Sequence, residues 1–201
     1  MEHFYKNIQG WFNFQSLYTK VVNELPNNSH IVEIGAWKGR STAYLAVEIS
    51  NSGKNIKLDV VDTWGGNTDA ARDMYIEDVK NNNGNIIKLF EKNIESIKHL
   101  INSINLPSAK ASLLYKNKSL DFVFIDANHV YESTKEDILS WLPKIKDGGI
   151  IGGHDYHFKD LPGVTQAVDE IFKGKVLHVD GSIDENRPDA FIVPSWLVYL
   201  S

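Results

Sequence analysis

The stretch HIVEIGAWKGRSTAYLAVEIS, residues 30–50, decides the fold. Its apolar run at 31–34 predicts a short strand, and the periodic apolar residues at 41–49 predict a helix. Gly35 and Gly39 lie between the two, with no polar linker. A strand that passes through a glycine turn straight into a helix offers backbone that a ligand can approach closely. The stretch therefore predicts a ligand-binding turn in an α/β protein.

The same alternation of strand and helix continues along the chain. Further strands are predicted at 57–62, 100–104, 120–126, 150–153, 175–179 and 196–200, and helices at 14–25, 69–93 with a break at 81–85, 108–115, 133–141 and 164–172. A turn is expected at KDGG, residues 146–149. Apolar strands separated by helices indicate a doubly wound α/β sheet, covered on both faces. We expect one domain over residues 1–201, in which residues 1–28 form an N-terminal helical cap segment.

Composition excludes several classes of function. The chain has 201 residues, 42% of them hydrophobic, which suits one well-buried domain. Its net charge of -5, without a lysine or arginine block, argues against a nucleic-acid partner. The absence of cysteine excludes thiolate chemistry and disulfides, and fits a cytoplasmic protein. No apolar run reaches the roughly 18 residues that span a bilayer, so no membrane association is expected.

Polar residues gather where the predicted strands end. Glu33 and Gly35 close the first strand, Asp62 closes the second, and Asp126 closes the strand at 120–126. His154 and Asp155 directly follow the strand at 150–153. Because ligands bind outside the carboxyl ends of the strands in open α/β sheets, these residues predict one site at that edge.

The glycine turn also indicates the kind of ligand. Its spacing is G-x-x-x-G, which lacks the tight pyrophosphate turn of G-x-G-x-x-G enzymes. Glu33 would repel a pyrophosphate but accept a hydrogen bond from an ammonium group. Ser41 opens the helix, where free N–H groups favour a carboxylate, and Asp62 stands where an acid commonly binds ribose hydroxyls. These residues favour a cofactor with an amino acid end and a ribose over NAD.

Three motifs, VEIGAWKGRS, VVDTW and SLDFVFIDANHVYESTKEDILSWLPKIKDGGIIGGHDY, together resemble the class I S-adenosylmethionine-dependent methyltransferases. The resemblance is strongest to the small-molecule O-methyltransferase branch that includes macrolide-sugar methyltransferases, and it covers residues 31–172. It implies a Rossmann-like, mostly parallel seven-stranded sheet with an antiparallel last strand. It also implies methylation of a small-molecule or sugar hydroxyl, with S-adenosylmethionine as cofactor.

The resemblance also assigns cofactor contacts. Glu33, Gly35 and Gly39 would line the methionine end and Ser41 would lie beside its carboxylate. Asp62 would bind the ribose, Trp64 would lie near the adenosine and Ser108 near the adenine. This sequence has LPSA at 106–109, where relatives more often carry an acidic residue before the serine.

The chemical centre implied by the resemblance lies in IDANHVYE and GGHDY. Asp126 and Asp155 match the carboxylates that hold Mg²⁺ or another divalent metal in metal-dependent members. His154 would be a third ligand, and its imidazole suits a transition metal better than Mg²⁺. His129 matches the general base of the sugar methyltransferases, and a histidine is suited to removing a hydroxyl proton near neutral pH. Asp126 and His129 are therefore the predicted catalytic residues.

Other interpretations stay open from the sequence. The glycines could serve strand-to-helix packing, Asp62 and Asp126 could cap turns, and the histidines could be structural. The methyltransferase could work without metal, or the domain could bind a cofactor or partner without turnover. Aromatic residues Trp11, Phe12 and Phe14 suit core anchors better than a lid. Loops at 65–69, 157–163 and 180–188 are expected to contact the acceptor, and a homo-oligomer is left open.

Overall fold

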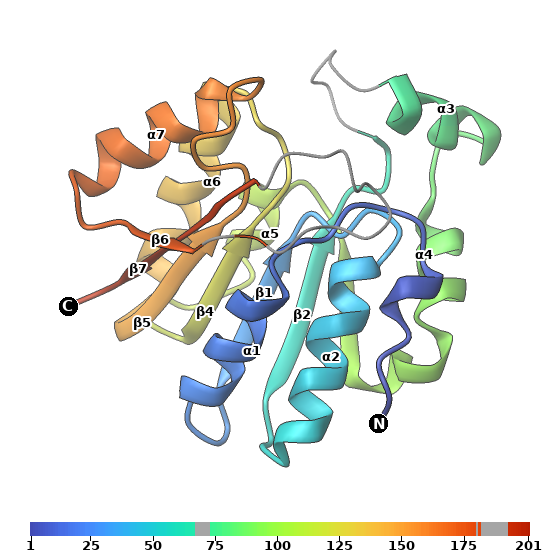
Figure 1. The fold of residues 1–201 in the computed structure, drawn as a ribbon, viewed down its shortest axis with the longest axis horizontal. Coiled ribbons are helices and arrows are strands. Elements are labelled where there is room, and N and C mark those ends of the chain that lie inside the picture. The colour runs from blue at the N-terminus through green and yellow to red at the C-terminus, as the bar shows by residue number, and fades with distance from the viewer. Residues whose placement is uncertain (67–72, 180, 182–192) are drawn as a thin grey trace.

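The computed structural model describes residues 1–66, 73–179, 181 and 193–201. One seven-stranded sheet runs through the molecule in the order β3-β2-β1-β4-β5-β7-β6 (Figure 1). Its strands are β1 (His30–Ile34), β2 (Lys57–Asp62), β3 (Ile101–Asn105), β4 (Leu120–Ile125), β5 (Ile145–Gly153), β6 (Leu177–Val179) and β7 (Ser195–Tyr199). The last strand, β7, is antiparallel to β5 and β6, whereas the strands from β3 to β5 pair in parallel. The predicted fold class is confirmed.

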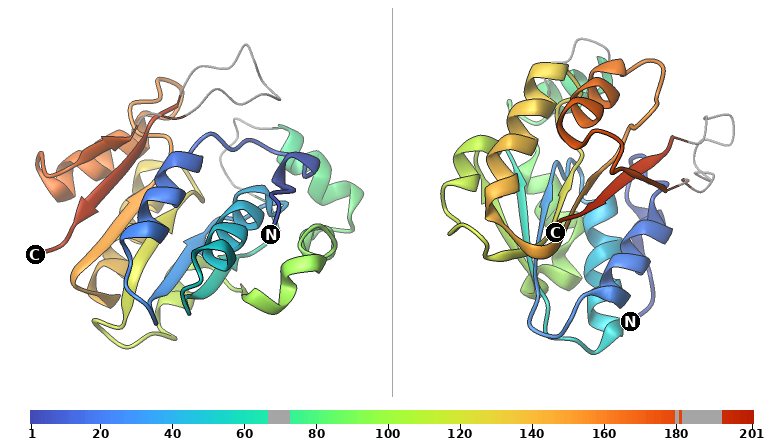
Figure 2. Two further views of the ribbon diagram at one scale, coloured as in Figure 1. Left: turned by 60° about the horizontal axis from the view of Figure 1, so that its bottom comes forward. Right: turned by 90° about the vertical axis from the view of Figure 1, so that its left-hand side faces the viewer.

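Helices cover both faces of this sheet (Figure 2). One layer contains α1 (Gln15–Glu24), α2 (Arg40–Ser52) and α4 (Ile87–Asn93), and the other contains α5 (Ser108–Ser112), α6 (Tyr131–Trp141) and α7 (Pro162–Phe172). A further helix, α3 (Asp73–Asn81), precedes α4, and short 3-10 helices lie at Tyr5–Asn7, Glu95–Leu100 and Leu142–Lys144. None of the described helices is long and apolar enough to cross a membrane.

The side-chain pattern of the central strands explains this layering. Ile31 and Phe122 belong to the core under α1 and α2, whereas their neighbours Val32 and Val123 belong to the core under α6 and α7. Because successive residues of a strand point to opposite faces, a strand that is apolar at every position must be covered on both sides. Glu33 lies on the same face as Ile31, so its carboxylate points into the layer of α1 and α2.

Strand order reverses between β1 and β4, and the functional loops leave the sheet at this point. After β1 the chain turns into α2 on one face, and after β4 it turns into α6 on the other. The Gly35 N–H donates to Val61 O at 2.9 Å, and the Asp126 N–H donates to Ile34 O at 2.8 Å. These bonds extend the strand pairing by one residue and hold the two turns together above the carboxyl edge.

Several predicted elements differ from the structure in their limits, and two of the differences have a clear cause. The helix predicted at 69–93 is divided into α3 and α4 at the expected asparagine-rich break. Its residues 69–72 lie outside the described residues, as do 67–69, 180 and 182–188 of the predicted acceptor loops. The predicted turn at 146–149 lies inside β5, which begins at Ile145. Gly148 has a φ of +74° there, and the pairing register with β4 shifts between Leu120 and Phe122. The two glycines at this irregularity give the strand the composition of a turn, which is why the sequence predicted a turn there.

Candidate functional site

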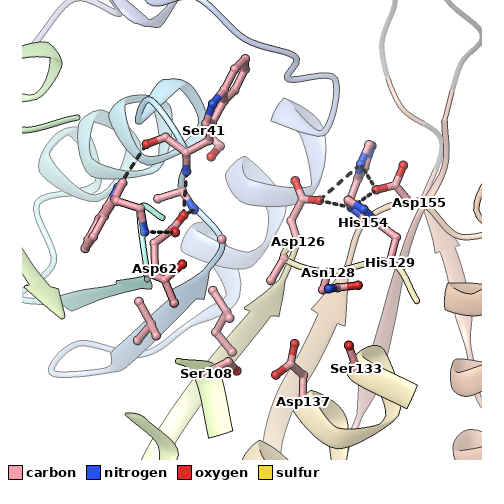
Figure 3. A pocket seen from close by; sticks show the side chains of 18 of the residues that line it. Ser41, Asp62, Ser108, Asp126, Asn128, His129, Ser133, Asp137, His154 and Asp155 are labelled. Carbon is pink, nitrogen blue, oxygen red and sulfur yellow. Dashed lines mark hydrogen bonds and ion pairs between the residues drawn. The ribbon is translucent and has the colours of Figure 1, made fainter. Parts of the chain in front are cut away.

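A cavity of about 770 Å³ opens over the carboxyl ends of β1, β2 and β4 (Figure 3). Most of the predicted site residues line it, namely Gly35, Ser41, Asp62, Trp64, Ser108, Asp126, His129, His154 and Asp155. Within the described part of the chain, Glu33 and Gly39 lie outside its wall. The structure therefore brings the predicted cofactor contacts and the predicted chemical centre together in one cavity, except for Glu33 and Gly39.

Packing within the protein already demands both glycines of the turn. Gly35 has a φ of +86°, and a Cβ there would lie 1.9 Å from the Asp126 carbonyl oxygen. Gly39 has a φ of +88°, and a Cβ would lie 3.0 Å from atoms of Phe90 and Ile94. No larger residue fits at Gly35, where two backbones approach closely, whereas at Gly39 the positive φ and the side chains of Phe90 and Ile94 disfavour one. Gly35 thus serves strand packing as well as lining the cavity, and Gly39 packs against α4.

Asp62 holds the glycine turn through backbone hydrogen bonds. Its Oδ2 accepts from Ala36 N at 2.8 Å and Trp37 N at 2.9 Å, and its Oδ1 accepts from Trp64 N at 2.7 Å. Burial raises the pKa of Asp62, and these N–H groups oppose that rise. Asp62 therefore fixes the turn while it lines the cavity.

Glu33 is buried between β1, α1 and α2. Its Oε1 accepts from the Tyr18 hydroxyl at 2.8 Å, and its Oε2 accepts from the Thr42 hydroxyl at 2.5 Å. Burial raises the pKa of Glu33 to about 7 despite these bonds and one from Ser41. The predicted contact of Glu33 with a ligand ammonium group stays a prediction, while the observed contacts join α1 and α2 to the sheet. Through Ser41 they reach the wall of the cavity.

Two predicted adenosine contacts lie on the side of the cavity near Asp62. Trp64 is buried, and its Nε1 donates to Trp37 O at 3.1 Å. Ser108 begins α5, and its Oγ accepts from Trp141 Nε1 at 2.9 Å. Asp137 on α6 also lines the cavity, and burial raises the pKa of its carboxyl group to about 6. Asp137 was not predicted from the sequence, although a charged residue on the buried stripe of α6 with Thr134, Ile138 and Trp141 is a usable signal.

At the other end of the cavity, two carboxylates and two imidazoles converge (Figure 3). His129 Nε2 lies 2.9 Å from Asp155 Oδ2 and 3.5 Å from Asp126 Oδ1. His154 Nδ1 lies 3.3 Å from the same Asp155 oxygen and 3.9 Å from Asp126 Oδ1. Asp155 has a φ of +58°, a strained backbone conformation for a residue other than glycine. The two predicted loops therefore meet at one centre.

Asn13, from the N-terminal segment, fixes the orientation of the His154 ring. Its Nδ2 donates to Val193 O at 3.0 Å, so its Oδ1 faces His154 Nε2 at 2.7 Å. An amide oxygen can only accept, so His154 Nε2 carries a proton and donates it. Nδ1 is then the nitrogen that faces both carboxylates. No pattern in the sequence indicates this role of Asn13, because Asn13 lies far along the chain from His154.

This arrangement requires a positive charge at the centre. A neutral His154 with its proton on Nε2 would present the Nδ1 lone pair to two carboxylates. Burial lowers the pKa of His154, but Asp155 and Asp126 outweigh it and raise the pKa overall. Burial likewise raises the pKa of Asp155, and His154 and His129 bring it well below its usual value. A proton on His154 Nδ1 supplies this positive charge. A metal cation could supply it as well, because oxygens of Asp126 and Asp155 and a nitrogen of His154 lie within 4.8 Å of one another.

The N-terminal segment closes one side of the cavity. Phe12 and Phe14 are buried in the core and also reach the cavity wall. Trp11 stacks on Trp37, with ring centroids 5.4 Å apart and an interplanar angle of 14°. Arg40 Nη1 donates to Gly10 O at 2.7 Å, which fastens the segment to the start of α2. The segment thus combines core anchoring with a wall of the site.

The strand order, the glycine turn after β1 and the acid after β2, all at one cavity, define a class I S-adenosylmethionine-dependent methyltransferase fold. A family model described as "Methyltransferase domain" matches residues 32–156, and the chain belongs to this family.

Solved structures with the same fold include several O-methyltransferases. The O-methyltransferase NovP shares 17% identity over 93% of this chain and 79% of its own, with a TM-score of 0.61. An O-methyltransferase from Thermotoga maritima shares 13% identity over 92% of this chain and 64% of its own, with a TM-score of 0.60. CalS11, a TDP-rhamnose 3'-O-methyltransferase of calicheamicin biosynthesis, shares 15% identity over 92% of this chain and 76% of its own, with a TM-score of 0.56. No curated protein sequence matches the chain.

Proposed function

We propose that the protein transfers a methyl group from S-adenosylmethionine to a hydroxyl of a small molecule or sugar, with a divalent metal at the acceptor. The observation that carries this proposal is a single cavity with a different chemistry at each end. The glycine turn and Asp62 lie at one end, and the cluster of Asp126, His129, His154 and Asp155 lies at the other. A cofactor and an acceptor bound at these ends would meet near the middle, which is what direct transfer between them requires.

The residues present suit the cofactor. Asp62 and Ser108 offer oxygens to ribose and base, and Ser41, near the N-terminus of α2, offers a hydroxyl and a helix start to a carboxylate. The volume of about 770 Å³ falls in the range of about 300–1,000 Å³ of small-molecule sites. When bound, S-adenosylmethionine supplies an electrophilic methyl group. The protein's part is to hold the acceptor oxygen in line with that group and to exclude water.

The acidic cluster suits a divalent metal. Two carboxylates and an imidazole nitrogen whose orientation Asn13 fixes form a mixed oxygen and nitrogen donor set. Such a set favours Mn²⁺, Fe²⁺, Co²⁺ or Zn²⁺ over Mg²⁺, which prefers oxygen ligands. When bound, a metal lowers the pKa of an acceptor hydroxyl and orients it. Asp126, His154 and Asp155 would hold it.

His129 is positioned to take the proton of the acceptor. Its Nε2 lies beside Asp155 and Asp126, so a proton that arrives on this nitrogen creates a cation next to two carboxylates. That arrangement stabilises the protonated ring and favours proton removal from a hydroxyl. The acceptor class draws support from CalS11, whose name specifies a sugar hydroxyl.

Calorimetric titration tests the cofactor. S-adenosylhomocysteine is expected to bind and NAD is not, because the turn lacks a pyrophosphate cradle. Tight NAD binding without S-adenosylhomocysteine binding would overturn the proposal.

Chelation and metal replacement test the second part. Transfer to a panel of sugar and phenolic acceptors is expected to stop with EDTA and return with Mn²⁺. Asp155→Asn should abolish Mn²⁺ binding, measured by the paramagnetic resonance of free Mn²⁺. The matched control is Asp147→Asn, because Asp147 is an exposed carboxylate paired with Lys118 on the surface. Full activity after exhaustive chelation would support the metal-independent alternative.

A further inference from the structure

The N-terminal segment ahead of α1 contacts both ends of the cavity, and we call its residues 8–14 the strap. Figure 1 shows the chain here, in dark blue, passing over the start of α2 on its way to α1. Trp11 and Asn13 both line the cavity, but Trp11 contacts the glycine turn whereas Asn13 contacts His154. One short piece of chain therefore adjoins the cofactor end and the acceptor end.

Two buried cations join the first half of the strap to the start of α2. Lys38 Nζ donates to Gln9 Oε1 at 2.9 Å, and Arg40 Nη1 donates to Gly10 O at 2.7 Å. Lys38 is 5% exposed and Arg40 is 4% exposed, and buried charges need polar partners. Lys38 has a second partner in Asp78 on α3, at 2.7 Å. The strap thus supplies hydrogen-bond acceptors to both cations.

Trp37 connects the strap to the acid that is predicted to bind the ribose. Its ring stacks on Trp11, and its backbone N–H donates to Asp62 Oδ2 at 2.9 Å. Trp37 has a φ of +45°, an uncommon conformation for a residue with a large side chain, so its position depends on such contacts. A ligand that holds the glycine turn in place therefore also fixes the ring on which the strap rests.

The second half of the strap holds the imidazole of the acceptor end. Asn13 Oδ1 accepts from His154 Nε2 at 2.7 Å, and the ring centroids of Phe14 and His154 lie 4.9 Å apart. In the sequence only Trp11 and Phe12 separate Asn13 from Gly10. Release of the strap from the glycine turn therefore moves Asn13 and frees the His154 ring to rotate.

We propose that the strap couples the two ends of the cavity, so that a ligand on the glycine turn raises the affinity of Asp126, His154 and Asp155 for a divalent metal. The inference rests on the proposed function, because it joins the two sites of that proposal. Its two states are the strap docked on the glycine turn and the strap released, and each ligand favours the docked state. Lys38 and Arg40 are then positioning residues for His154 that act through the strap.

The test is Mn²⁺ binding, measured by paramagnetic resonance with and without saturating S-adenosylhomocysteine. This compound lacks the positive sulfur of the cofactor, so charge repulsion between sulfur and metal does not enter. Wild-type protein is expected to bind Mn²⁺ about fivefold or more tightly in its presence, and Mn²⁺ should raise the affinity for S-adenosylhomocysteine by the same factor. Hydrogen exchange at the amides of residues 8–14 reports the strap itself and should slow with either ligand alone.

Gly10→Ala displaces the strap without changing a side chain of the cavity wall. Gly10 has a φ of +139°, and a Cβ there would lie 3.0 Å from Trp37 Cζ3. Gly10 is absent from the described residues that line the cavity. The coupling factor, which is the ratio of Mn²⁺ affinities with and without S-adenosylhomocysteine, is expected to fall to within about twofold. S-adenosylhomocysteine should then no longer slow exchange in the strap.

A second variant and a control accompany Gly10→Ala. Gln9→Leu removes the acceptor of the Lys38 bond at an exposed position and should lower the coupling factor about twofold, with little risk to folding. Gly174→Ala is the matched control, because Gly174 also has a positive φ, of +80°, and a Cβ there meets no described atom within 4 Å. It should keep the wild-type coupling factor.

Equal Mn²⁺ affinity of wild-type protein with and without S-adenosylhomocysteine overturns the inference. A coupling factor that stays at the wild-type value in Gly10→Ala and Gln9→Leu overturns it as well, since the ligands would then interact directly across the cavity. Failure of wild-type protein to bind S-adenosylhomocysteine or Mn²⁺ at all would instead overturn the proposed function, so the two failures are distinguishable.

Discussion

The two ends of the cavity are built in different ways. At the cofactor end, Asp62 binds backbone N–H groups of the adjoining glycine turn, and the bonds join β1 and β2, which are neighbours in the sheet. At the acceptor end, Asp126, His154 and Asp155 come from two loops, and Asn13 reaches them from the N-terminal segment. Hydrogen bonds to the backbone hold the cofactor end in place, whereas contacts between side chains hold the acceptor end. We therefore expect mutations at the first end to cost stability and mutations at the second to change ligand binding.

Gly35→Ala is expected to have the largest effect. Its Cβ would lie 1.9 Å from the Asp126 carbonyl oxygen, and the residue has a positive φ, so either β1 or β4 must move. We expect a loss of about 4 kcal/mol or more of unfolding free energy, measured by urea denaturation.

The control for Gly35→Ala is Gly53→Ala at the end of α2. Gly53 also has a positive φ, of +68°, but among the described residues a Cβ there meets nothing within 4 Å. It should cost only about 1 kcal/mol. Equal losses in the two variants would show that backbone strain, and not the contact between β1 and β4, is what demands Gly35.

This contrast also explains how far the sequence predicts the structure. The strands, the glycine turn and Asp62 depend on local patterns and on neighbours in the sheet, and the sequence located them. Asp126, His154 and Asp155 were predicted to lie together because strand ends meet at one edge, and His129 was predicted from the family resemblance. Asn13 and Asp137 were not predicted, because their surroundings are set by tertiary packing. The contacts of Glu33 with α1 and α2 were not predicted either, and its contact with a ligand stays a prediction.

The second largest expected effect is the change of unfolding free energy with pH that Glu33 causes. Its folded pKa of about 7 lies above the ordinary glutamate value of 4.5, so the folded state retains a proton that the unfolded state loses. The stabilising contribution is fully present below about pH 4.5 and is lost as pH rises through 7. The shift corresponds to about 3 kcal/mol.

Glu33→Gln does not titrate and isolates this contribution. Relative to the variant, wild-type protein should lose about 3 kcal/mol of unfolding free energy between pH 4.5 and pH 8, measured by denaturation at each pH. Glu132→Gln, at an exposed position, should follow the wild-type slope. Parallel pH profiles for wild type and Glu33→Gln would mean that Glu33 is ionised throughout this range in the folded protein.

Asn13 tests the acceptor end. Asn13→Leu removes the acceptor that holds the His154 Nε2 proton, so Nδ1 is no longer held toward the carboxylates. Mn²⁺ affinity, measured by paramagnetic resonance, is expected to fall about tenfold to a hundredfold. Asn13→Asp keeps an oxygen facing Nε2 and should restore the affinity. Equal weakening in both variants would indicate lost packing of the N-terminal segment and not lost ring orientation.

His154→Glu is expected to have the smallest effect. It should change which metal the site prefers without preventing metal binding. The substitution converts a mixed nitrogen and oxygen donor set at Asp126, His154 and Asp155 into an all-oxygen set. Because Mg²⁺ prefers oxygen ligands and imidazole favours transition metals, the ratio of Mg²⁺ to Mn²⁺ affinity should rise about tenfold. Competition titrations of the two metals measure the ratio directly. An unchanged ratio would mean that His154 acts as a protonated partner of the carboxylates and not as a ligand, and it would place the metal, if bound, on Asp126 and Asp155 alone.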